Sequence, residues 1–335
     1  VTLVNPVQSV GLKWAKPFGD WSLFAEMEAG ISRLEWQGDD MAPVLEDGFS
    51  DFSGGFFHRP SRVKVRLGWR QVGANFRSAG AQTKRIRFER APQAYQRYTN
   101  DQILRGLSTY DLLRDGTLYN TQLEAGLMQF DPKYGNALPY GLATPNRRGV
   151  TARVDWTSTN DAINLGGRFS MLNDIAGQGT DQLRTFNLMQ VDGSLHLDKY
   201  FGWERKLELS ALWSMEATSR DGDPAFETSD LTNNLINIFA EWEFYDMLSL
   251  LAEFRTYSSS GRDQYARRNE YSEVIDFVEV NHDANEALLG GGLQYRFDEK
   301  IAVQLFYQRF QWEDTALDLP AYDWDNWQFN FIMTL

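Results

Sequence analysis

The sequence of 335 residues contains no cysteine, which excludes disulfides, thiolate metal sites and cysteine nucleophiles. Its three histidines, His58, His196 and His282, lie far apart and lack the spacing of paired metal ligands. No run of 18 apolar residues is present, so no helical membrane span is predicted. The formal net charge of -13 argues against nucleic acid as a partner, because phosphate binding needs a clustered basic face. We therefore expect a protein without metal or other cofactor.

Aromatic residues make up 14% of the chain, yet 24% of residues are charged and the mean hydropathy is -0.46. Such a composition suits a sheet with one wet face. The stretch "DNWQFNFIMTL" at 325–335 shows the pattern, with Trp327, Phe329, Phe331, Met333 and Leu335 on alternate positions. Alternation with period two is the signature of a β-strand that is apolar on one side only.

Thirteen segments alternate in this way over about ten residues or more. The predicted strands are 8–18, 21–36, 61–76, 117–130, 147–159, 162–174, 184–200, 206–219, 233–245, 247–258, 286–298, 300–313 and 325–335. Very short connections such as 19–20 and 245–246 alternate with long polar ones such as 37–60 and 259–284. Strands this long exceed the globular average but fit a tilted membrane crossing.

Aromatic residues also gather beside the predicted turns, where rings with a polar handle favour the lipid headgroup level. They predict two membrane-interface belts that include Trp14, Trp21, Trp203, Trp242, Tyr245, Trp312, Trp324 and Trp327.

The aromatic C-terminal strand resembles the terminal signature of Gram-negative outer-membrane β-barrel proteins, which are porin-like in architecture. The resemblance implies that the barrel assembly machinery reads Trp327, Phe329, Phe331 and Leu335 as an assembly signal. It also implies a bacterial outer membrane location and contact with outer-membrane lipid and lipopolysaccharide. The predicted fold is all-β, a single antiparallel transmembrane β-barrel domain over 1–335, with about 14 strands (12 to 16).

Segment 77–116 is the part that fits this scheme least. An antiparallel barrel with both ends in the periplasm needs an even strand number, and a fourteenth strand at 84–90 would supply it. Residues 98–116 instead carry helical spacing, with Thr99 or Asn100 as a cap. Segment 77–116 is therefore either an inserted loop or plug in the interior, a helix on the rim, or an extra strand.

Charged residues occupy the polar face of the predicted strands, because a charge facing lipid near the midplane costs about 2–4 kcal/mol. The predicted pore-lining residues are Arg62, Lys64, Arg66, Arg153, Arg168, Glu208, Glu216, Glu241, Glu243, Glu253, Arg255 and Arg296. Arg62, Lys64 and Arg66 form a basic ladder along one predicted strand, whereas five glutamates gather on three consecutive strands: Glu208, Glu216, Glu241, Glu243 and Glu253. They predict either a transverse field across a water-filled pore or a set of salt bridges inside a narrow barrel.

No nucleophile with a nearby base is evident, so we expect no enzymatic activity. Arg147 and Arg148, in a turn-rich stretch, suggest a grip on lipopolysaccharide phosphate or a neighbouring protein. The favoured function is a porin-like channel for passive diffusion of small polar solutes. The alternative is a non-conducting barrel that acts as scaffold or anchor in a cell-envelope complex. A homo-oligomer or an envelope partner protein fits either function.

Overall fold

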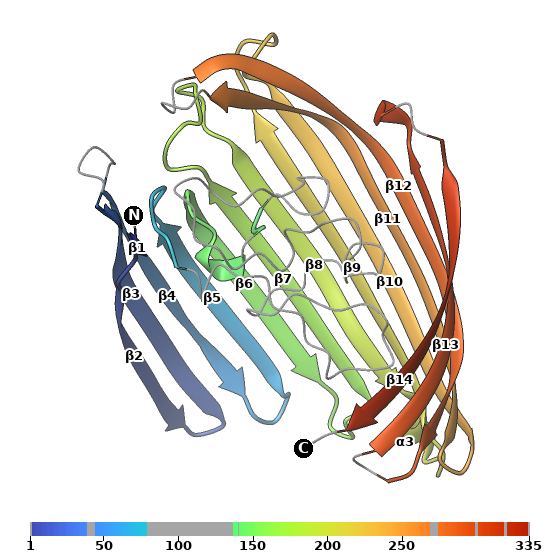
Figure 1. Ribbon diagram of the computed structural model, residues 1–335. Coiled ribbons are helices and arrows are strands. Elements are labelled where there is room, and N and C mark those ends of the chain that lie inside the picture. Colours follow the sequence, from blue (N-terminus) through green and yellow to red (C-terminus); the bar gives the residue numbers. More distant parts are fainter. Residues whose placement is uncertain are drawn as a thin grey trace.

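The computed structural model describes residues 2–38, 44–78, 137–139, 141–268, 274–298, 301–317 and 320–333. These residues form one antiparallel sheet of 14 strands that curls into a barrel wall (Figure 1). The strands are β1 Thr2–Val4, β2 Val7–Phe18, β3 Trp21–Gln37, β4 Leu45–His58, β5 Val63–Val72, β6 Arg147–Thr157, β7 Ile163–Asn173, β8 Thr185–His196, β9 Leu207–Arg220, β10 Ser229–Tyr245, β11 Leu248–Arg268, β12 Val274–Arg296, β13 Ile301–Asp314 and β14 Tyr322–Met333. Short helices add α3 Leu197–Phe201, η3 Gly141–Ala143 and η4 Thr315–Leu317.

Neighbours in the sheet are neighbours in the sequence from β3 to β14. β1 and β2 both pair with β3, at Leu3↔Trp36 and Lys13↔Glu26, so they form one edge strand interrupted at Asn5 and Pro6. Proline has no backbone N–H to donate to a ladder, which explains the break. The 14 strands therefore occupy thirteen positions side by side, and the two termini lie at opposite ends of the strands (Figure 1).

β4 corrects the prediction that 37–60 is a connection, because Leu45–His58 pairs along β3 and β5. Its sequence, "LEDGFSDFSGGFFH", carries aromatic rings on both faces. Phe52 shares the outer face with Gly48, Ser50 and Gly54, whereas Phe49 and Phe57 lie on the inner face. Period two is consequently hidden, and the glycines weaken the strand signal further.

The hairpin of β11 and β12 corrects the prediction that 259–284 is a polar loop. Pairing continues from Leu248↔Tyr295 as far as Arg268↔Val274, with a register shift at the last pair. Beyond about residue 260 both faces of the hairpin carry charged and polar side chains, so apolar alternation stops although the ladder does not. Hydrogen bonding, which the hydrophobic pattern does not report, holds this extension.

β5 and β6 pair directly, from Val63↔Trp156 to Val72↔Arg147. The predicted strands at 84–90 and 117–130 and the predicted helix at 98–116 lie outside the described residues, as does nearly all of 77–116. Only Arg77 and Ser78 of that segment are described, and both are buried.

The two faces of the sheet differ as the alternation predicts. Outward side chains are apolar and exposed, such as Val10 at 67%, Leu67 at 62% and Phe329 at 72%. Inward positions hold buried polar side chains, among them Ser170 and Gln190. An apolar outer face around a polar interior is the arrangement of a transmembrane barrel. No helix among the described residues is long and apolar enough to cross a membrane.

A charge on the outer face tests this orientation. Val150 lies outward on β6 and is 49% exposed, whereas its neighbour Thr151 lies inward. We expect Val150→Arg to lower the free energy of unfolding in lipid vesicles by about 2–4 kcal/mol, because the guanidinium enters hydrocarbon. Thr151→Arg adds the same charge to the wet face and serves as control, measured in the same urea titration. Equal losses in the two variants would contradict the assignment of the faces.

Candidate functional site

Three arginines form a row across the inner face of β5, β6 and β7. Arg66 is the register partner of Arg153, and Arg153 is the partner of Arg168. The side chains of Arg66 and Arg153 are each 37% exposed, so they reach water inside the barrel wall. The sequence suggested basic residues in line along one strand, whereas pairing places them in line across three strands.

Carboxylates and an aromatic ring hold this basic row in place. Arg153 pairs with Asp155 on its own strand at 2.9 Å, and Arg66 reaches Glu26 of β3 at 3.5 Å. Lys64 and Arg66 both lie over the ring of Phe24, each 5.3 Å from its centroid. Half-exposed pairs of this kind contribute about 0–1 kcal/mol each, so they orient the cations more than they stabilise the fold.

Arg62 is not pore-lining, which corrects the prediction. It lies in the turn between β4 and β5 with a φ of 53°, before β5 begins at Val63. Its guanidinium donates to the carbonyl of Ser158 at 2.6 Å and pairs with Asp161. Arg62 therefore ties two neighbouring short turns together. A strand prediction that begins two residues too early moved it onto the wall.

Acidic residues of β9 and β10 form a second cluster at the short-turn end of the inner face. Glu208 and Glu241 are register partners, and Lys206 Nζ bridges their carboxylates at 2.9 and 2.8 Å. Glu241 also accepts from Arg296 at 2.9 Å and from Ser249 at 3.1 Å. Two like charges facing each other are thereby neutralised, and the cluster acts as a salt-bridged support for the wall.

The carboxylates of this cluster stabilise the charged form of Lys206. Burial alone would lower the pKa of Lys206, but hydrogen bonds and Coulombic attraction from Glu241 and Glu208 outweigh burial and raise it above the ordinary value. Its contribution to stability is therefore fully present at neutral pH and is lost only as the pH rises through the raised pKa.

The remaining predicted lining residues occupy less accessible positions. Glu243 caps the β10–β11 turn, where it accepts from the backbone N–H of Met247 at 3.0 Å. Glu216, Glu253 and Arg255 lie on the inner face but are only 7%, 2% and 1% exposed. These three side chains are thus far less open to water than Arg66 and Arg153.

A buried ionic network at the long-connection end was missed in the sequence. Asp174 accepts from Arg147 at 2.9 Å and from Arg184 at 3.1 Å, and Arg184 also pairs with Asp263 at 3.5 Å. All four are at most 4% exposed. Arg147 therefore does not grip lipopolysaccharide phosphate, and only its outward neighbour Arg148 is exposed. These residues are separated by up to 116 positions, so no local motif announces the network.

Both described ends of the connection between β5 and β6 turn inward. Near its start, the ring of Phe76 meets Phe49 of β4 with centroids 5.1 Å apart, and Arg77 N–H donates to Ser32 of β3 at 2.8 Å. Near its end, Ala137 N–H donates to Glu216 of β9 at 3.1 Å. Ala137 and Leu138 pack with Leu172, Phe186 and Leu188. These contacts narrow the interior on two sides.

Most of the predicted interface aromatics are exposed, and two are corrected. The exposed fractions are 49% for Trp14, 41% for Trp21, 53% for Trp203, 50% for Trp242, 65% for Tyr245 and 67% for Trp327. Trp312 is 4% exposed on the inner face of β13, and Trp324 lies inward on β14 in line with Phe310. Nearness to a turn does not fix the face of a ring. The face depends on whether the residue holds an inward or an outward position of its strand. Phe329 and Phe331 are outward, while Leu335 lies outside the described residues.

Comparison with known proteins gives likenesses of fold only. No family model and no curated protein matches the chain. Among solved structures the chain is similar to in-vitro folded OmpT in trimer form, an outer membrane protein of Vibrio cholerae. The TM-score is 0.35 at 11% identity, over 98% of this chain and 96% of that chain. An OmpT mutant lacking loop L8 gives a TM-score of 0.35 at 11% identity, over 98% and 99%.

Likenesses at these TM-scores carry no argument about sites or function. The fold class stands on the sheet itself, which is antiparallel, apolar outside and polar inside, as in outer-membrane β-barrels. The chain therefore has the fold class that the sequence predicts, an antiparallel β-barrel wall, and the bacterial outer membrane stays its predicted location.

Removing the central carboxylate of the buried network gives a stability prediction. Asp174→Asn leaves Arg147 and Arg184 buried without their shared partner, so we expect a loss of about 3–5 kcal/mol in the free energy of unfolding. Asp161→Asn, which breaks the exposed pair with Arg62, should cost at most about 1 kcal/mol. Urea unfolding of both variants in lipid vesicles makes the comparison. A similar small cost at both sites would contradict a stabilising role for the network.

Proposed function

We propose that the protein is a porin-like channel for passive diffusion of small polar solutes across the outer membrane. The observation that carries the proposal is the half-exposed basic row Arg66, Arg153 and Arg168 on the inner face of β5 to β7. A sealed barrel has no need of cations held in reach of water. Glu208 and Glu241, on β9 and β10, face another part of the interior, so solutes enter a region of uneven charge.

The inward ends of the β5–β6 connection support a passage of restricted width. Phe76 and Arg77 line one part of the wall and Ala137 and Leu138 another. A narrowed, charged passage selects small polar solutes by size and sign and needs neither cofactor nor energy source.

Conductance tests the proposal directly. We expect purified, folded protein in planar bilayers to give discrete current steps. The double variant Arg66→Gln, Arg168→Gln removes two cations of the basic row. Because a cationic lining attracts anions, we expect its reversal potential in a salt gradient to shift in the direction of higher cation selectivity. Arg309→Gln is the matched control, since Arg309 lies outward and pairs with Asp323.

Two results would oppose the channel. Folded protein that never conducts would end the proposal. Equal shifts of the reversal potential in the control and in the double variant would show that the basic row does not determine ion selectivity.

A second candidate function is a non-conducting barrel that anchors an envelope complex. The buried inner side chains of β11 favour it, since Arg255 is 1% and Asp263 is 0% exposed, as in a filled interior. Purification in mild detergent separates the two candidates. Stoichiometric companion proteins together with silent bilayers would favour the anchor, whereas a lone chain or an oligomer of itself that conducts would favour the channel.

A further inference from the structure

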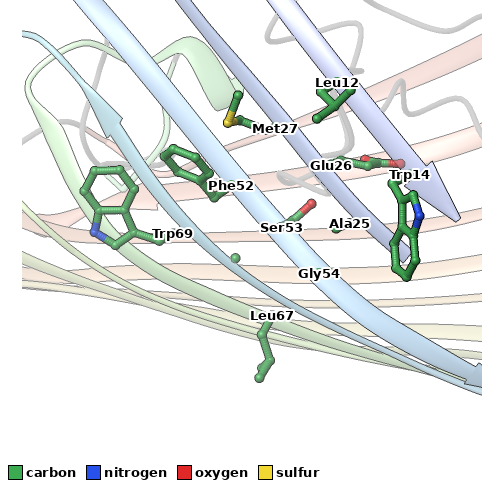
Figure 2. Close-up of a pocket in the computed structure, with 11 residues that line it drawn as sticks. Leu12, Trp14, Ala25, Glu26, Met27, Phe52, Ser53, Gly54, Leu67 and Trp69 are labelled. Carbon is green, nitrogen blue, oxygen red and sulfur yellow. The ribbon is translucent and has the colours of Figure 1, made fainter. Parts of the chain in front are cut away.

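A groove of about 430 Å³ lies on the outer face of β2 to β5 (Figure 2). We call it the outer-face groove. Its lining residues are Leu12, Trp14, Ala25, Glu26, Met27, Phe52, Ser53, Gly54, Leu67, Gly68 and Trp69. The volume falls in the range of small-molecule sites, about 300–1,000 Å³.

Strand register explains the shape of the groove. Trp14 pairs with Ala25, Ala25 with Gly54, and Gly54 with Leu67, so the two smallest side chains stand in the middle of one outward row. The adjoining row is large throughout, with Met27 opposite Phe52. Small residues thus make a floor, and rings and branched chains make the walls (Figure 2).

The outward lining is hydrocarbon in character. Its members are Leu12, Trp14, Ala25, Met27, Phe52, Gly54, Leu67 and Trp69, none of which carries a charge. Glu26 and Ser53 are register partners that alternate with them and so belong to the inner face. Ligand sites usually place a few polar groups to orient a polar ligand. Apart from the indole N–H groups of Trp14 and Trp69, the outward lining has none, so the outer-face groove suits a ligand segment that is itself apolar.

The height of the groove places it within the bilayer. Ala25 is four residues along β3 from Trp21, where the strand leaves its short turn. At about 3.3 Å per residue this is roughly 13 Å along a tilted strand. The apolar band of such barrels is about 25 Å tall, so the groove opens onto lipid tails in the half of the bilayer on the short-turn side. It is continuous with the lipid-facing surface.

We propose that the outer-face groove binds one acyl chain of a membrane phospholipid. In hydrocarbon no hydrophobic force drives association, so binding depends on close packing. A chain lying on Ala25 and Gly54 touches walls on both sides and gains dispersion contacts that a flat face does not offer. A second copy of this chain is a less suitable occupant, because a stable protein interface buries about 800 Å² per partner rather than filling one recess. The site does not depend on whether the barrel conducts.

Photo-crosslinking tests the site in the full chain reconstituted in vesicles. The probe is a phosphatidylcholine with a diazirine in its acyl chain, and mass spectrometry of digested protein locates the label. We expect label on peptides carrying Trp14, Phe52 and Trp69 to exceed several-fold the label on outward residues of β13 and β14.

A large side chain at Gly54, on the floor of the outer-face groove, gives the decisive variant. A Cβ at Gly54 meets only the Phe24 carbonyl at 3.4 Å, so Gly54→Leu extends into the groove without a clash at its base. We expect its labelling to fall to the background of the outer face. Gly167→Leu is the matched control, because Gly167 is outward on β7 with nothing within 4 Å of an added Cβ. Trp69→Ala removes a wall instead and should also lose the enrichment, which keeps the test valid if Gly54→Leu folds poorly.

Three outcomes would overturn the proposal. Uniform labelling of the outer face in the unaltered protein would show no bound chain. Enrichment that survives both Gly54→Leu and Trp69→Ala would place the lipid elsewhere. If the unaltered protein shows no label in the groove but forms oligomers, and Gly54→Leu dissociates them, the groove binds a second copy of the chain instead.

Discussion

Backbone hydrogen bonding in a medium without water is the constraint on which this structure depends. Within lipid an unpaired N–H or C=O group costs several kcal/mol, so strands cross only as members of a ladder. The ladders from β3 to β14 satisfy this demand with neighbours in sequence. Once pairing is fixed, each side chain must point to lipid or to the interior. The apolar outer face, the polar inner face and the placement of charge all follow from that choice.

Charge in the interior is distributed unevenly, and this asymmetry organises the candidate site. On β5 to β7 the arginine row stays half exposed, held by Glu26, Asp155 and the ring of Phe24. On β9 to β11 the charges are buried and paired, as at Glu241 with Lys206 and Arg296. The arginine row therefore offers charge to water, whereas the charges around Glu241 and Asp174 hold strands and connections together.

Alternation alone predicted the architecture, because period two reports directly which face meets lipid. It failed where that signal stops. β4 was not predicted, because glycines and aromatic rings occur on both of its faces. The extension of the β11–β12 hairpin was not predicted, because both of its faces carry polar side chains. The sequence indicated which face of the sheet the charged residues occupy, but not which of them lie next to one another. That Arg66, Arg153 and Arg168 share a row, or that Asp174 joins Arg147 to Arg184, depends on register between distant residues, which one sequence does not contain. The errors at Trp312 and Arg62 show that a shift of one or two positions changes the face or the element to which a residue is assigned.

The interrupted edge strand made by β1 and β2 has a consequence for the seam of the wall. Strands in thirteen successive positions alternate in direction, so β2 and β14 run the same way along the barrel. Direct contact between them would form a parallel ladder with slanted hydrogen bonds, unlike every other pair in the sheet. Antiparallel closure instead takes an odd number of additional strands. In copies of this chain inserted in the same orientation, the two described edges, β2 and β14, would meet each other in parallel. Strand direction therefore restricts what can pair with these edges.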